Sequence, residues 1–216
     1  MAEPPAALHH PSMASDEHTS EPAVTRWTRA TVYPDMWVDP DDDPRETEVG
    51  EVVDERSALL ESLRHYRLTL EMKCAGLDAE QMARRSAAPS TMSLLGLVRH
   101  LTEDERHFRR VMAGEDAPKL YRTEEDRDGD FNGAVADPEV VEAAWRQWRT
   151  DVELTDRYLA GVTDLSTLNA GYSDYGAEPG GQLQLRDVLV AHVGEYARHC
   201  GHADLLRELI DGRVGQ

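Results

Sequence analysis

The last apolar segment of the chain contains side chains that commonly bind metal ions. It reads His192-Val-Gly-Glu195-Tyr-Ala-Arg-His199-Cys-Gly-His202. Four positions separate Glu195 from His199, so in a helix the two side chains lie one above the other on one face. Apolar residues before and after this run indicate a face directed towards a core, where unpaired polar groups cost free energy. A divalent cation would pair several of these groups at once.

A second segment, Leu97-Val-Arg-His100-Leu, supplies a matching histidine in phase with its apolar residues. One imidazole from this segment and the Glu195/His199 pair make three ligands and leave a fourth coordination position open. That arrangement is typical of catalytic rather than structural zinc sites. Nickel and iron(II) also accept two imidazoles and a carboxylate, so the residue types do not select the metal.

Simpler interpretations of these residues stay open at this stage. His100 is also compatible with a core histidine whose nitrogens are hydrogen-bonded, and Glu195/His199 with an ordinary helical ion pair. His107 stands among charged residues, which indicates a solvent-exposed face. We expect His192 and His202 to orient the ligands from outside the coordination sphere rather than to bind the metal themselves.

Three rival chemistries fit less well. A di-iron carboxylate bundle needs paired E-x-x-H motifs, whereas Glu195 and His199 have the spacing E-x-x-x-H. The glycines near residue 180 are not followed by the Lys-Ser/Thr of a phosphate-binding loop. Cys200 is a conceivable nucleophile, but it points about 100° away from His199 on a helix, which favours packing.

Helical periodicity of apolar residues predicts the elements that position these groups. The expected long helices run from Asp54 to about Gly76, from Ser90 or Ser93 to Gly114, from Pro138 to Gly161, and from Leu185 to Ile210. Asp78 is expected to cap a short helix, and the polar stretch 115–137 is expected to form only a surface loop. The predicted fold class is all-α, an antiparallel up-down four-helix bundle.

The N-terminal segment divides into two parts. Residues 1–22 are rich in proline and polar groups, which predicts a disordered tail. Residues 23–216 are expected to form a single four-helix-bundle domain. Within it, Trp27 and Trp37 need an apolar surface, so we expect an extended N-terminal arm that lies over the helical body.

Composition excludes several classes of function. The chain has 23 Lys and Arg against 42 Asp and Glu, a net charge of −19, which disfavours nucleic acid as a partner. No apolar run approaches the roughly 20 residues of a membrane helix, and the N-terminus lacks a secretory signal pattern. Two cysteines are too few for a disulfide framework, and the absence of such a framework is typical of proteins in the reducing cytoplasm.

The segments around His100 and from Glu195 to Arg207 resemble those of the DinB-like superfamily over roughly residues 25–213. The resemblance implies a four-helix bundle, often dimeric, with a divalent metal held by His100, Glu195 and His199. The glutamate at position 195 resembles the residue found at this place in mycothiol-dependent maleylpyruvate isomerases, which are related to thiol transferases. The isomerases have a second, C-terminal domain that this chain does not show after Gly212, so the maleylpyruvate substrate is not carried over.

These observations predict a metal-dependent, zinc-preferring thiol S-transferase or thiol-assisted isomerase, with a low-molecular-weight thiol such as mycothiol as co-substrate. The second reactant would be an electrophilic small molecule, and the protein a cytoplasmic homodimer. Arg99, Arg198 and Arg207 are candidates for a basic rim around the thiol. Two other classes stay open: a non-catalytic, metal-stabilised binding or stress-response bundle, and a plain bundle with structural histidines.

Overall fold

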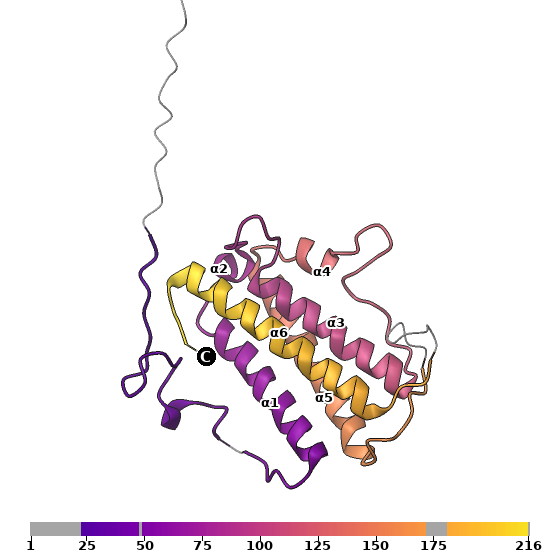
Figure 1. Ribbon diagram of the computed structural model, residues 1–216. Helices are drawn as coiled ribbons and strands as arrows, with labels where there is room; N and C mark the ends of the chain where they lie inside the picture. Colours follow the sequence, from indigo (N-terminus) through magenta and orange to yellow (C-terminus); the bar gives the residue numbers. More distant parts are fainter. Residues whose placement is uncertain (1–22, 48, 172–180, 216) are drawn as a thin grey trace, which may run out of the picture.

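The computed structural model describes residues 23–47, 49–171 and 181–215; the predicted tail at 1–22 lies outside them. The elements are η1 (Pro40–Asp42), α1 (Glu55–Cys74), α2 (Ala79–Ala83), α3 (Leu94–Ala113), α4 (Gly129–Asn132), α5 (Pro138–Gly161) and α6 (Leu185–Asp211). Within the described ranges the regular structure is entirely helical, as predicted. The four long helices α1, α3, α5 and α6 pack side by side as a bundle (Figure 1).

Local sequence signals explain where the helices begin and end. Asp54 and Ser57 form a capping box at the start of α1. Of the two serines considered for α3, Ser93 is the cap, and its hydroxyl accepts from the N–H of Gly96. Gly114 ends α3 in the left-handed region, with φ of 65°, a conformation that side chains with a Cβ rarely adopt.

The order of the helices around the bundle is α1, α6, α3 and α5. Arg109 on α3 contacts Asp151 on α5, and three residues later on α3 the Met112 carbonyl accepts from Tyr158, so these two helices run in the same direction. The chain between them returns along the whole bundle (Figure 1). The four-helix bundle is therefore confirmed, but this long connection replaces the simple up-down order, since only a short loop forces neighbours to be antiparallel.

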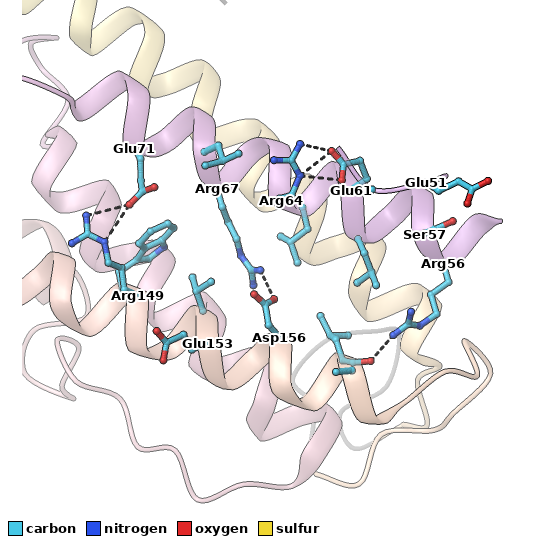
Figure 2. A pocket seen from close by; sticks show the side chains of 18 residues that line it. Glu51, Arg56, Ser57, Glu61, Arg64, Arg67, Glu71, Arg149, Glu153 and Asp156 are labelled. Carbon is cyan, nitrogen blue, oxygen red and sulfur yellow. Dashed lines mark hydrogen bonds and ion pairs between the residues drawn. The ribbon is translucent and has the colours of Figure 1, made fainter. Parts of the chain in front are cut away.

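The seam between α1 and α5 is less tightly closed than the others. Long side chains hold it: Arg67 pairs with Asp156, and Arg149 with Glu71. Between these ion pairs lies a groove of about 770 Å³, lined mostly by apolar groups such as Trp148 (Figure 2).

The N-terminal arm packs on the helical body, as expected. Trp37 is only 3% exposed, and its ring is flanked by three cations. Arg213 lies 3.5 Å from the ring centroid, Lys73 lies 4.3 Å away and Arg207 lies 5.1 Å away. Trp27 forms a backbone bridge with Arg213, so the arm and the segment after α6 secure each other.

The expectation of a mere surface loop between α3 and α5 is wrong for its second half. Residues Gly129–Asn132 form α4, which lies against α3 (Figure 1). Asp130 in this turn is completely buried, and Arg99 donates hydrogen bonds to the carbonyls of Asp130 and Gly129. Polar composition suggested exposure, but a buried carboxylate is stable when charged partners surround it.

Candidate metal centre

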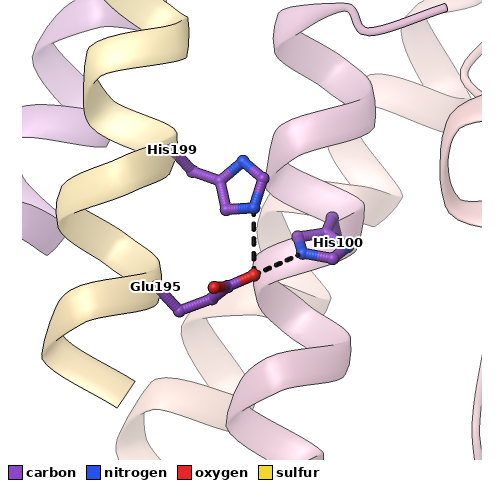
Figure 3. Close-up of side chains that lie close together, drawn as sticks. All are labelled: His100, Glu195 and His199. Atoms are coloured by element: carbon purple, nitrogen blue, oxygen red, sulfur yellow. Dashed lines mark hydrogen bonds and ion pairs between the residues drawn. The ribbon is translucent and has the colours of Figure 1, made fainter. Parts of the chain in front are cut away.

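His100 on α3 and the Glu195/His199 pair on α6 meet where the two helices pack against each other (Figure 3). The Nε2 atom of His100 lies 3.2 Å from Glu195 Oε1, and the Nε2 atom of His199 lies 3.1 Å from the same oxygen. One potential ligand atom from each residue falls within 4.8 Å of the others. Two segments 95 residues apart thus direct two imidazole nitrogens and one carboxylate oxygen at one point.

This donor set fits a divalent cation. Ligand atoms of a tetrahedral zinc site lie about 3.4 Å apart, given bonds of about 2.1 Å, so the observed separations need only small side-chain adjustments. The two imidazole rings are 4.5 Å apart between centroids. Both rings direct nitrogen at the same oxygen, an arrangement that is satisfied either by protons or by a metal ion.

Asp130 orients the first imidazole. Its Oδ2 atom lies 2.9 Å from His100 Nδ1, and Arg122 Nε donates to the same oxygen at 2.9 Å. With one proton of the ring directed at this carboxylate from Nδ1, Nε2 faces Glu195 and is the nitrogen available to a metal ion once its own proton is displaced. Carboxylate–histidine–metal arrangements of this kind fix the tautomer and the ring orientation of a ligand.

The other two histidines of α6 have different surroundings. His202 Nδ1 lies 3.2 Å from His199 Nδ1, so His202 contacts that ring from outside the three candidate ligands. His192 does not contact the three candidate ligands in the described structure. It is buried between Asp104, at 2.6 Å, and Glu105, at 3.4 Å.

Hydrogen bonds between the three groups shift their ionisation. Hydrogen bonds from His100 and His199 hold the pKa of the Glu195 carboxyl well below its usual range, although burial opposes this. Burial disfavours the charged form of His100, but hydrogen bonds with Asp130 and Glu195 outweigh it and raise its pKa to about 9. The metal-free centre is therefore a carboxylate paired with protonated imidazole, and a cation must displace that proton.

A pocket of about 720 Å³ opens beside the centre. His100 and Glu195 form part of its wall, and the rest comes from α3, from the loop after it and from Gly171, which follows α5. The polar residues of this wall are Glu103, Asp104, His107, Arg110, Glu115, Lys119 and Arg122. A small molecule in this space therefore has direct access to His100 and Glu195.

Sequence reasoning missed part of this environment. Asp130 and Arg122 lie in a polar stretch with no helical periodicity, so nothing marked them except their charge. His107, assigned to a solvated face, instead lines the pocket.

The prediction of a basic rim formed by Arg99, Arg198 and Arg207 is wrong for two of these three arginines. Arg207 is buried at the far end of α6, where it binds the carbonyls of Lys73 and Ala75. Arg99 binds the backbone of α4. Of the three expected arginines only Arg198 approaches the centre, 3.6 Å from Glu195 Oε2.

Comparisons with known proteins identify the family and the fold of the chain. A family model described as mycothiol-S-transferase matches residues 58–212, which include all three candidate ligands. A solved structure of a conserved protein from Enterococcus faecalis is similar with a TM-score of 0.52 and 17% identity, over 74% of this chain and 99% of that one, which shows a shared fold. No curated protein matches the chain. Because the family match spans well over half of the sequence, the chain belongs to the mycothiol-S-transferase family, as its DinB-like motifs implied.

Proposed function

We propose that this protein is a divalent-metal-dependent S-transferase that joins a low-molecular-weight thiol, mycothiol, to an electrophilic small molecule. The observation that carries the proposal is the convergence of His100, Glu195 and His199 beside an open pocket, whose wall includes His100 and Glu195. The family match supplies the thiol.

In this proposal the three side chains hold the cation, and the pocket supplies the open side of the site. A bound divalent cation would supply Lewis acidity, which lowers the pKa of a thiol from about 8.5 towards neutrality. Asp130 keeps the proton of His100 on Nδ1, and His202 supports His199 from the side away from Glu195. The remaining pocket wall binds and orients the two reactants.

Zinc is the metal we propose, because it has no redox chemistry and tolerates three protein ligands with one open position. Nickel and iron(II) are the competing outcomes. The described helices include none long and apolar enough to cross a membrane. The cytoplasmic location and the homodimer remain predictions, and light scattering during gel filtration tests the second.

The first test is metal analysis of protein purified without a histidine tag. We expect about one divalent ion per chain, and its loss in His100→Ala, Glu195→Ala and His199→Ala variants. Wild-type protein without stoichiometric metal, after incubation with zinc, would contradict the metal site and favour a plain bundle.

The second test is turnover with mycothiol and a panel of electrophiles, with consumption of thiol as the readout. We expect turnover by the metal-loaded protein and none by the His199→Ala variant. Bound metal without turnover across the panel would favour the non-catalytic, metal-stabilised bundle instead.

A further inference from the structure

The loop that follows α3 forms one wall of the pocket and is fixed firmly to the helix. The Oε1 atom of Glu103, whose residue is 5% exposed, accepts hydrogen bonds from the backbone N–H groups of Leu120 and Tyr121, each at 2.7 Å. Arg106 donates to the Pro118 carbonyl at 2.9 Å. These contacts determine the position of the backbone on both sides of residue 119.

Lys119 projects from this fixed loop and lines both the pocket and a smaller hollow that adjoins it. Its side chain makes no ion pair or hydrogen bond with any group in the part of the chain that the structure describes. Arg110 lines the same pocket and donates to the carbonyl of Ala117 at 2.6 Å. Three cations therefore line the pocket, Arg110, Lys119 and Arg122, and Lys119 forms no ion pair within the described residues.

Three of the four carboxylates of the pocket wall have cationic partners of their own. Asp104 pairs with His192 at 2.6 Å, and Glu115 pairs with Arg109 at 3.0 Å. Glu195 faces the two imidazoles. The fourth, Glu103, accepts from the loop backbone through Oε1, and its buried Oε2 atom has no hydrogen-bond partner among the described residues. None of these four carboxylates forms an ion pair with Lys119.

Lys119 is thus a local positive charge without an ion pair, in a chain whose net charge is −19. A cation in a concave site concentrates anionic ligands there, because the low-dielectric walls focus its field. We propose that the electrophilic substrate of this enzyme carries a carboxylate, and that Lys119, with Arg110 beside it, binds that group. The inference rests on the proposed transferase function and adds the chemical class of the second substrate.

The charge is assigned to the electrophile for a geometric reason. The thiol must place its sulfur at the centre formed by His100, Glu195 and His199. The negative charge of the thiolate is therefore compensated at that centre and does not need Lys119. Lys119 lies on a different part of the wall, the loop after α3, and in this proposal it serves the molecule that approaches the sulfur. A lysine ammonium is a compact point charge, which suits a single carboxylate.

The test compares two electrophiles of nearly equal shape, 4-chloro-3-nitrobenzoate and 4-chloro-3-nitrobenzamide, with mycothiol as the thiol. In both reactions a bond forms between sulfur and the ring carbon and the C–Cl bond breaks. Chloride leaves with the bonding pair, and the thiol proton passes to solvent. Lys119→Met should raise KM for the benzoate roughly tenfold, the effect of losing one hydrogen bond to a charged group, and leave KM for the benzamide unchanged.

Lys119→Glu should go further and reverse the preference, so that the benzamide becomes the better substrate. Arg149→Met, which removes a cation from the distant α1/α5 groove, is the matched control and should change neither KM. An equal effect of Lys119→Met on both electrophiles would overturn the proposal. So would a raised KM for mycothiol with the KM for benzoate unchanged, because the cation would then serve the thiol.

Equilibrium dialysis separates this inference from the proposed function. The metal-free wild-type protein should bind the benzoate more tightly than the benzamide, and Lys119→Glu should abolish the difference. If no turnover is seen but this binding difference is present, the transferase proposal fails and the anion subsite stands. Equal binding of the two compounds to the wild-type protein overturns the subsite.

Discussion

Two hollows of similar size occupy different seams of the bundle. The groove between α1 and α5 measures about 770 Å³, and the pocket beside α3 and α6 measures about 720 Å³. In the groove, charged side chains from opposite helices pair with each other, as in Arg67–Asp156 and Arg149–Glu71 (Figure 2). Beside the pocket, three potential electron-pair donors from two helices meet at one point (Figure 3).

The difference shows that volume is a poor guide to chemistry in this protein. Opposite charges in the groove satisfy each other and close a seam that lacks tight packing. At the α3/α6 contact, two imidazoles and a carboxylate converge and require a proton or a cation between them. In this protein, a candidate functional site is therefore better recognised by several electron-pair donors that converge on one point than by the volume of the neighbouring cavity.

The largest expected effect comes from removing a ligand. Glu195→Ala should abolish stoichiometric metal binding and lower kcat/KM for mycothiol conjugation at least 1,000-fold, roughly 4 kcal/mol, because only two imidazoles remain. Metal analysis and initial rates measure both effects. Glu71→Ala, which removes a carboxylate from the groove, should leave metal content and rate within twofold; a comparable loss in that variant would erase the distinction between the two regions.

The next effect concerns a residue that lies in the groove but also reaches the core. Arg67 pairs with Glu105, whose side chain is completely buried, at 2.8 Å. Arg67→Met should lower the free energy of unfolding by about 3–5 kcal/mol, because Glu105 is left as a buried charge without its main partner. Urea denaturation measures the loss, and metal affinity of the folded protein should not change.

Arg149→Met is the control for that experiment, since its ion pair with Glu71 is largely exposed. Its effect on unfolding should stay within about 0.5 kcal/mol. Equal losses in the two variants would show that the groove, rather than the buried pair, carries the stability.

A smaller effect is expected from the carboxylate behind the first imidazole. Asp130→Asn should weaken metal binding by about 10- to 100-fold, because His100 loses the partner that fixes its tautomer. Competition with a chromophoric chelator measures the affinity. Asp156→Asn on the groove side should leave it unchanged, and an unchanged affinity in Asp130→Asn would remove the orienting role.

The last prediction is a pH dependence. Since the pKa of His100 is raised to about 9 by its hydrogen bonds, this imidazole is protonated at pH 7 in the metal-free protein. Metal binding must release that proton, so apparent metal affinity should rise about tenfold from pH 7 to pH 8 and level off near pH 9. The same chelator titration at each pH tests this; a flat profile from pH 7 to 8 would show that His100 is not a ligand.

Much of the helical framework could be predicted from the sequence. Capping residues and apolar periodicity are local properties, so Asp54, Ser93 and Pro138 marked helix starts that the structure confirms. The Glu195/His199 pair was predictable for the same reason, because helix geometry alone determines the distance between positions i and i+4. The packing of the arm was predictable from Trp37, since exposed indole rings are costly in water, whereas Trp27 stays 38% exposed.

Other features depended on contacts that no local pattern encodes. The parallel direction of α3 and α5 follows from a long connection, whose path depends on α4 packing against α3. The burial of Asp130 depends on His100 and Arg122, 30 and 8 residues away in the chain. The unpaired charge of Lys119 became visible only when the partners of the surrounding acids were known.

The sequence by itself determined the helices, their apolar faces and the two halves of the candidate ligand set, because these properties depend on spacing within single segments. Only the tertiary structure decided that the two halves meet, which carboxylate stands behind His100, and which of the two hollows adjoins them. Those outcomes depend on how helices far apart in the chain pack against one another, and such packing is settled by the whole core rather than by any one stretch of residues.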